Sequence, residues 1–145
     1  MLKLDMINAM LQAVGENPVT DAESQNPSAI AARSTLNRIS SIVQEKPWKF
    51  NTEVALTLLP NVQGEIVLPE NTLYFIPDND YTYIVERGKK LYDTALHTFI
   101  FTESVIGTLR LIFPPQDCPE PIGQYISAYA TWSHYMNDDG DGVID

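Results

Sequence analysis

The residues best suited to chemistry lie near residue 140, where asparagine, aspartate and glycine follow the spacing of a calcium-binding loop. Asn137, Asp139 and Asp141 would occupy positions one, three and five of an EF-hand loop, and Gly142 would provide the sharp turn at position six. The bidentate glutamate of position twelve falls outside the 145 residues, so we expect little affinity for calcium. We therefore interpret residues 138–145 as a solvated acidic tail, with a calcium-responsive protein-binding module as the alternative.

Catalytic chemistry is not indicated elsewhere in the sequence. His97 falls in a strand-like stretch and His134 near the end of a helical one, and neither has a carboxylate or nucleophile at a useful spacing. Cys118 is the sole cysteine, so it cannot form an internal disulfide, and we expect it to be a small apolar residue. The sequence contains no glycine-rich phosphate loop. It thus predicts neither an enzyme nor a cofactor or metal site.

The chain is strongly acidic, with nine lysines and arginines against nineteen aspartates and glutamates and a net charge of −10. The basic residues are scattered, whereas a protein that holds nucleic acid needs a basic stripe to neutralise phosphates. An acidic surface would instead let DNA pass without sticking, although it can also serve solubility alone.

Targeting signals are not indicated either. No run approaches the ~20 apolar residues of a membrane span, and Asp5 and Asn8 interrupt the apolar stretch that a signal peptide requires. We expect a single soluble domain over residues 1–145, located inside the cell when it is made.

Two helices are predicted in the first third of the chain. Apolar residues recur at helical spacing over residues 3–14, and Gly15 follows as a helix terminator. Asn26 and Pro27 then provide the N-cap and the first-turn proline of a second helix over residues 27–45. The core positions of this second helix are Leu36, Ile39 and Val43.

The pattern changes after the second helix. Pro47 ends it, and we expect Trp48 and Phe50, two apart on extended chain, to pack together at the seam between helices and sheet. Ligand stacking by this aromatic pair is the alternative. From residue 52 to 113 apolar residues alternate with polar ones between proline and glycine turns, which predicts five to seven short antiparallel strands. The expected strands include short ones around residues 66–68 and 99–101.

A third helix completes the fold. Pro119-Glu120-Pro121 begins it, and apolar residues keep helical spacing to about residue 136. We expect Tyr125 and Tyr129 to be core positions of this helix. The order predicts an α+β fold, a small helical bundle with an inserted antiparallel β-subdomain. The bundle would comprise residues 1–48 and 117–137, with helices near 3–14, 27–45 and 120–136, and the insertion residues 49–116, with its strands between about 50 and 114.

Three stretches of the chain follow one another in the order found in a known protein family. They are INAMLQAVGENPV (7–19), TLNRISSIVQEKPWKFNTE (35–53) and TLLPNVQGEIVLPENTL (57–73). They resemble tail tubular protein A of short-tailed, autographivirus-type bacteriophages. In that family a helix ends in Gly-x-x-Pro-Val, a second helix ends at Gln-x-x-x-Trp-x-Phe-Asn, and a strand ends in Leu-x-Pro before a further Leu-Pro. The resemblance covers most of residues 4–130. The matching positions are Gly15, Pro18, Val19, Gln44, Trp48, Phe50, Asn51, Leu59, Pro60, Leu68 and Pro69.

This resemblance implies a structural virion protein, the head-to-tail adaptor or gatekeeper of the phage. Family members form a homo-oligomeric ring, a dodecamer, between the portal protein and the tail nozzle (tail tubular protein B), in contact with other tail proteins such as the fibres. Double-stranded DNA passes through the ring during packaging, retention and ejection, and no membrane is involved. The implied location is the virion, after synthesis in the host cytoplasm. A hydrolase acting on cell wall or capsule is a further alternative, but the sequence lacks paired carboxylates in a recognisable setting.

The chain departs from the family pattern in one place. Family members continue past the third helix into a longer helical segment, whereas here we expect the helix to give way at Asn137 to the acidic tail. This departure affects the expected contact with the portal more than the expected fold.

Overall fold

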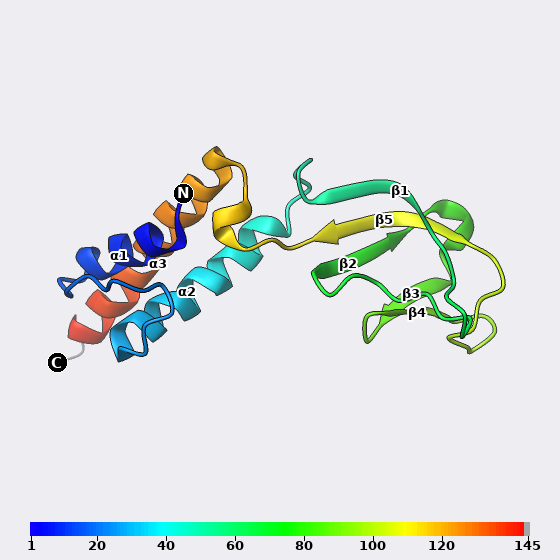
Figure 1. Cartoon of the computed structure of the whole chain (residues 1–145), viewed down its shortest axis with the longest axis horizontal. Helices are drawn as coiled ribbons and strands as arrows, with labels where there is room; N and C mark the ends of the chain where they lie inside the picture. Colours follow the sequence, from blue (N-terminus) through cyan, green and yellow to red (C-terminus); the bar gives the residue numbers. More distant parts are fainter. Residues whose placement is uncertain (144–145) are drawn as a thin grey trace. The chain divides into compact units, whose positions relative to one another are not determined.

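The computed structural model describes residues 1–143, with side chains as far as residue 138. It divides into two compact units (Figure 1). The helical unit consists of Met1–Lys46 and Phe113–Asp145, and the β unit consists of Pro47–Ile112. The α+β fold predicted from the sequence is confirmed. Over residues 1–143, no helix combines the length and the apolar character that a bilayer crossing would require.

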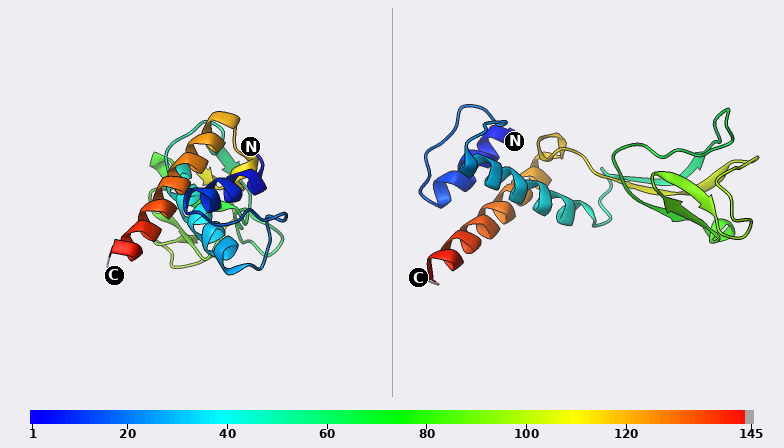
Figure 2. Two further views of the ribbon diagram at one scale, coloured as in Figure 1. Left: turned by 90° about the vertical axis from the view of Figure 1, so that its left-hand side faces the viewer. Right: turned by 90° about the horizontal axis from the view of Figure 1, so that it is seen from below.

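The helical unit is built from α1 (Lys3–Ala13), α2 (Pro27–Gln44) and α3 (Glu120–Val143), with the short 3₁₀ helix η2 (Pro115–Asp117) before α3. Each of the three α-helices packs against the other two (Figures 1 and 2). Apolar residues three and four apart form one buried stripe on each helix. The buried apolar residues of this unit are Met6, Ile7, Met10, Leu11, Ala29, Ala32, Leu36, Ile39, Val43, Cys118, Ile126 and Ala130.

Local sequence explains where α1 ends and α2 begins. Gly15 has a φ of 76°, and its N–H and that of Glu16 donate to the carbonyls of Gln12 and Leu11. This is a Schellman arrangement, in which glycine is favoured because a left-handed φ costs it little. The Asn26 side chain accepts a hydrogen bond from the Ser28 N–H, so it caps α2 as predicted.

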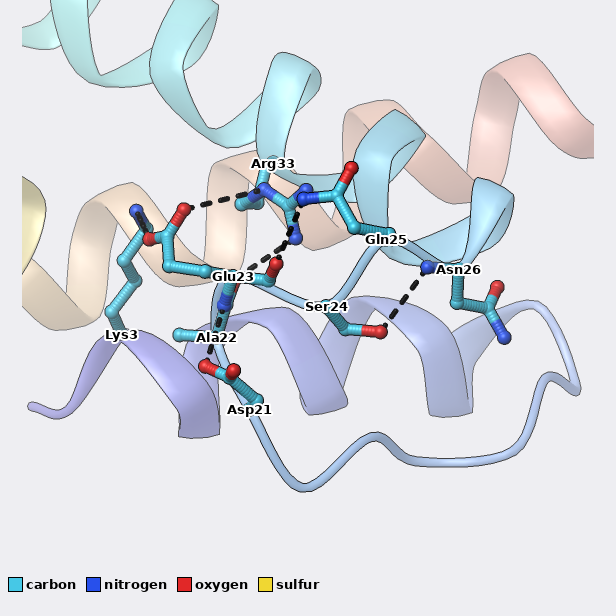
Figure 3. Close-up of polar contacts among 8 residues, drawn as sticks. All are labelled: Lys3, Asp21, Ala22, Glu23, Ser24, Gln25, Asn26 and Arg33. Atoms are coloured by element: carbon cyan, nitrogen blue, oxygen red, sulfur yellow. Dashed lines mark hydrogen bonds and ion pairs between the residues drawn. The ribbon is translucent and has the colours of Figure 1, made fainter.

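The segment between α1 and α2 is tied down by polar contacts rather than by apolar packing. Asn8 both accepts from and donates to the backbone of Val19. Glu23 lies 2.6 Å from the Lys3 ammonium, and Arg33 donates to the Ala22 carbonyl at 2.9 Å (Figure 3). The Lys3 hydrogen bond, together with its charge, lowers the pKa of the Glu23 carboxyl. The loop is therefore fixed at both ends and near its middle.

A buried glutamine anchors the strand that returns from the β unit. Gln44 is fully buried at the last position of α2. Its amide nitrogen donates to the Phe113 carbonyl at 2.8 Å and to Ser40 Oγ at 2.9 Å, while its oxygen accepts from the Phe113 N–H at 2.9 Å. Burying an amide without partners is costly, and these three hydrogen bonds remove that cost.

The β unit contains a three-stranded antiparallel sheet and a hairpin. The sheet has the order β1-β5-β2, formed by β1 (Thr52–Leu58), β5 (Val105–Leu111) and β2 (Thr72–Pro77). The hairpin pairs β3 (Ile84–Arg87) with β4 (Lys90–Asp93), and the 3₁₀ helix η1 (Asn79–Tyr81) precedes it. Gly88 and Lys89 both have positive φ, which matches the tight turns that join twisted hairpin strands. The core of this unit consists of Ile66, Leu68, Phe75, Ile84, Leu91, Val105 and Leu109.

The described residues contain five antiparallel strands, within the predicted five to seven, but two of the expected strands and the expected junction differ from the structure. Residues 66–68 and 99–101 make isolated bridges, Val67 with Lys90 and Glu65 with Ile100, in place of strands. Residues 49–51 form a bend and a turn, so the chain does not run extended from Trp48 to Phe50 as predicted. Short apolar runs carry too little periodicity to separate a strand from an irregular segment that still buries its apolar side chains.

The end of α3 also differs from the prediction. The helix continues through residues 138–143, where we expected an acidic tail, while residues 144 and 145 lie outside the described part of the chain. Two glycines and three aspartates disfavour a helix, but the turns that precede them already provide the nucleus from which a helix extends cheaply.

Candidate assembly surface

The residues with possible catalytic chemistry do not converge. His97 is exposed in the β unit with a φ of 56°, and His134 is half-buried on α3 in the helical unit. In the described part of the chain, no three His, Cys, Asp or Glu side chains lie close enough together to hold a metal ion. Burial raises the pKa of the Cys118 thiol to about 11, so this cysteine stays protonated and unreactive at neutral pH.

The calcium-loop hypothesis for Asn137, Asp139 and Asp141 is contradicted by the backbone. An EF-hand loop folds its alternating side chains around one ion, whereas these positions lie on a continuous helix that ends at Val143. Asn137 is exposed on that helix, and the side chains of Asp139 and Asp141 lie outside the described ones. The segment extends α3 instead of forming a loop.

The predicted core and junction residues separate into two groups. Leu36, Ile39 and Val43 are fully buried on α2. Trp48 and Phe50 are half-buried in the β unit, where the Trp48 carbonyl accepts a hydrogen bond of 2.6 Å from the Thr52 hydroxyl. Their packing at a seam between helices and sheet stays a prediction.

On α3 the assignment of Tyr125 to the core needs correction. Its side chain is 47% exposed, and Tyr129 is half-buried. The core stripe of α3 is formed by Ile126, Ala130 and the small buried residues near them, one position away from the tyrosines. A shift of one residue turns a side chain by about 100° around a helix, which is enough to move it from the core to the surface.

The outward side of α3 is therefore aromatic, and it is also uncharged. Residues 121–137 contain no lysine, arginine, aspartate or glutamate. Tyr125, Trp132, Tyr135 and Met136 lie three, four or seven residues apart and are each 45% to 60% exposed. A solvent-facing helix normally carries charges on its outer side, and contiguous exposed apolar surface marks a site of interaction. We refer to the outward side chains of residues 121–137 as the α3 face.

The rings of the α3 face hold one another in place. Tyr125 meets Tyr129, and Tyr129 meets Trp132, in edge-to-face contacts with ring centroids 6.2 Å apart in each pair. The Lys46 ammonium lies 5.9 Å from the centre of the Tyr125 ring. Rings that are already ordered lose little side-chain entropy when a partner covers them.

Two shallow hollows flank Trp132. One, of about 300 Å³, lies between Tyr125, Tyr129 and Trp132 above the small side chain of Ala128. The other, of about 560 Å³, runs between α1 and α3. At one end of the larger hollow, the Met1 amino group donates to Glu120 at 2.6 Å and lowers the pKa of that carboxyl. The larger hollow is lined by Met1, Ala9, Ala13, Gln124, Ser127, Ala128, Thr131, Trp132 and Tyr135.

A second apolar surface belongs to the β unit. Two of its loops lie side by side, because the Phe101 N–H donates to the Gly64 carbonyl and Glu65 forms a bridge with Ile100. Aliphatic side chains that are 53% to 97% exposed project from these loops. They are Leu59, Val62, Leu96 and Ile100.

Two exposed apolar surfaces give this protein the character of one that assembles with other protein chains. Comparison with known families agrees. The family model for tail tubular proteins matches residues 4–140, so the chain belongs to the tail tubular protein family. It is therefore a structural component of a bacteriophage tail.

A curated relative lies within the same family. Tail tubular protein A of Klebsiella phage KP34 is 34% identical over 141 residues, covering 97% of this chain and 75% of that protein. The family resemblance derived from the sequence is thereby confirmed. Among the motif positions, Gly15 terminates α1, Gln44 anchors Phe113, and Asn51 and Leu68 are buried.

Sequence reasoning overlooked the residues that dominate the α3 face. The apolar spacing of this helix predicts a core stripe and assigns no role to the exposed Trp132, Tyr135 and Met136. A different signal was present: seventeen consecutive residues without a formal charge, in a chain whose net charge is −10. A helix that carries no charge on its outward side is suited to be covered by a partner there.

Proposed function

We propose that this chain is the subunit of the head-to-tail adaptor ring of a short-tailed phage, placed between the portal and the tail nozzle. The observation that carries the proposal is the family match over residues 4–140. The relative in Klebsiella phage KP34 is itself described as a tail tubular protein A. Under this proposal the chain forms a ring, contacts portal protein, tail tubular protein B and fibre proteins, and surrounds the path of the genome.

The apolar surfaces support an assembling role. A ring subunit needs two different patches that complement each other on neighbouring copies, because only heterologous contacts close around an axis of high order. The helical unit offers the uncharged α3 face for such contacts. The aliphatic loops of the β unit, which include Val62, offer a further surface for other tail proteins.

The charge of the chain supports a role around DNA that does not involve gripping it. With a net charge of −10, a ring of such subunits would carry a strongly negative potential. This surface would repel duplex DNA. The DNA would move past it without lysines or arginines displacing the counterions from its phosphates.

The test is negative-stain imaging with mass measurement of the purified protein, alone and mixed with portal rings of the same phage. We expect rings, or caps seated on the portal. A protein that remains monomeric in both samples, at concentrations where portal rings are intact, would overturn the adaptor role.

A further inference from the structure

We infer that the α3 face of one copy docks against the outward side of α2 in the next copy, so that an aromatic ridge meets a face of small residues. This inference rests on the proposed ring function and names the contact that would build the ring. It follows from the charges of the two helices, from the shapes of their outward sides, and from the area that the ridge offers.

The charges of the three helices favour this pairing. Between Pro27 and Gln44, α2 carries no acidic residue, and its two arginines are engaged within their own chain, Arg33 with Glu23 and the Ala22 carbonyl and Arg38 with Ser133. By contrast, α3 carries four acidic residues and no lysine or arginine, with all of its charge outside residues 121–137. Two copies of a chain with a net charge of −10 repel each other, so they approach best where α3, which is acidic at its ends, meets a helix without acidic residues.

The same charges disfavour a symmetric contact between two α3 helices. In an antiparallel pair, Glu120 at the start of one helix would lie near Asp138 at the end of the other. Like charges placed opposite each other at an interface cost free energy and suppress the wrong pairing. Such a pair would cover the uncharged centre of each α3 helix, but the acidic residues at both ends of the pair would repel each other.

The outward sides of α2 and α3 differ in the size of their residues. On α3 the exposed side chains are large rings around Trp132, with hollows on either side. On α2 the exposed side chains are mostly short, and they alternate with the buried stripe of Leu36 and Ile39. A ridge of rings fits a shallow face better than it fits a second ridge. The exposed uncharged residues of α2 are Pro27, Ile30, Ala31, Ser34, Asn37 and Ile42.

The area available on α3 suits the centre of an interface. An aromatic side chain buries about 150–250 Å², so Tyr125, Trp132 and Tyr135, each near half exposure, together offer roughly 300 Å². A stable interface buries about 800 Å² on each partner. The rings would thus form the anchor, and the uncharged residues beside them would complete the contact.

The docking pair consists of two different faces of one unit, so the contact is heterologous. A second copy that binds through its α2 leaves its own α3 face open for a third. This property allows a test that a symmetric dimer or an unrelated partner would fail. If α3 is blocked on one copy and α2 on another, the first copy can still dock through its α2 and the second through its α3 face.

The experiment uses Trp132→Glu to block α3 and Ser34→Glu to block α2, with oligomer mass as the readout. We expect each variant alone to lose the ring and to run at the mass of the 16.3 kDa chain. An equal mixture should form a species of two chains and stop there. Tyr135→Glu and Ala31→Glu repeat the test at neighbouring exposed positions, so that misfolding of one variant, seen by circular dichroism, does not decide the result.

The matched control is Val54→Glu, which places the same charge on a strongly exposed apolar position of β1. It should leave the ring intact. Rings that survive Trp132→Glu, a mixture that stays monomeric, or a control that also dissolves the ring would each overturn the inference. Wild-type protein that caps the portal without self-association would overturn the inference and leave the adaptor role standing, whereas wild-type protein that does neither would overturn both.

Discussion

Gln44 shows how one buried polar side chain can connect two distant parts of the sequence. Its amide makes three hydrogen bonds, two of them to the backbone of Phe113, 69 residues away. We predict that Gln44→Ala lowers the free energy of unfolding by about 2–4 kcal/mol, because it removes these bonds and opens a cavity. Chemical denaturation followed by circular dichroism measures the difference.

The control for this prediction is Gln12→Leu on the exposed side of α1. An exposed substitution should change stability by no more than about 0.5 kcal/mol. If Gln44→Ala lowers the free energy of unfolding by no more than Gln12→Leu changes it, other contacts anchor the returning strand.

Two glycines should respond in opposite ways to the same substitution. At Gly107 on β5, an added Cβ would lie 2.2 Å from the Phe75 ring and 2.8 Å from the Ile76 carbonyl oxygen. At Gly123 on α3, the nearest atoms are 3.6 Å away, an ordinary contact distance. We predict that Gly107→Ala destabilises the protein by about 1–3 kcal/mol and that Gly123→Ala stabilises it by about 0.5–1 kcal/mol.

Thermal melting of the two alanine variants beside the wild type checks this pair. Melting temperatures that move in the same direction would contradict one of the two contact assignments. If Gly107→Ala melts like the wild type, Phe75 and the β5 backbone do not pack as closely as the structure places them.

The buried stripe of α2 depends on Leu36, which is fully enclosed by the three helices. An aspartate there would bury an unpaired charge, so we predict that Leu36→Asp costs more than about 4 kcal/mol and unfolds the helical unit. The matched control is Asn37→Asp, which adds the same charge at the next, exposed position. Far-UV circular dichroism and melting of both variants check this, and normal melting of Leu36→Asp would mean that the stripe is assigned to the wrong side of α2.

The loop between α1 and α2 should make stability depend on pH. The hydrogen bond and charge of Lys3 hold the pKa of the Glu23 carboxyl below its ordinary value of 4.5 (Figure 3). A carboxyl with a depressed pKa in the folded state stabilises the fold above the ordinary value, and that contribution is lost as the pH falls through the lower, folded value. We predict that Glu23→Gln melts below the wild type at neutral pH and that the difference disappears in acid.

Melting curves of wild type and Glu23→Gln across the acid range measure this difference. Glu70→Gln, which removes one negative charge at an exposed position of the β unit, is the control, and at neutral pH it should lower the melting temperature less than Glu23→Gln does. A gap between wild type and Glu23→Gln that persists below the folded pKa would mean that the glutamine disturbs the loop by some route other than charge.

The helices were easier to predict than the strands because they carry more independent signals. Gly15, Asn26 and Pro27 mark ends that do not depend on tertiary contacts, so α1 and α2 were predicted to within about one residue. The bridges at Glu65 and Val67 are made with Ile100 and Lys90, 35 and 23 residues away, a relationship that local alternation does not contain. The end of α3 was missed because helix propensity alone disfavours its last residues.

The α3 face could have been predicted from charge, but its partner could not. The sequence shows that residues 121–137 lack charge, which indicates a covered helix. Whether a ring such as that of Tyr125 points to the core or to solvent depends on how α3 is rotated against α1 and α2, and apolar spacing was satisfied by both rotations. The exposed side of α2 with Ser34 became recognisable only once the buried side was known.

The acidity of the whole chain leads to a prediction about DNA. With nine basic and nineteen acidic side chains, neither the monomer nor an assembled ring offers enough positive charge to displace counterions from phosphates. We predict no binding of duplex DNA in a gel-shift or anisotropy assay. This should hold even at about 10 mM salt, where screening extends over roughly 30 Å and electrostatic attraction would be strongest.

The comparison that gives this assay meaning is between Trp132→Glu and the wild type, since the variant tests the free chain and the wild type tests the assembly. Both should leave DNA unbound, because assembly through an uncharged face creates no basic surface. Binding by the wild type that weakens steeply with salt would show that the basic residues, among them Lys49, Arg87 and Lys90, gather on the path of the DNA in the ring. The channel would then hold the genome by attraction, and its release would require that attraction to be broken.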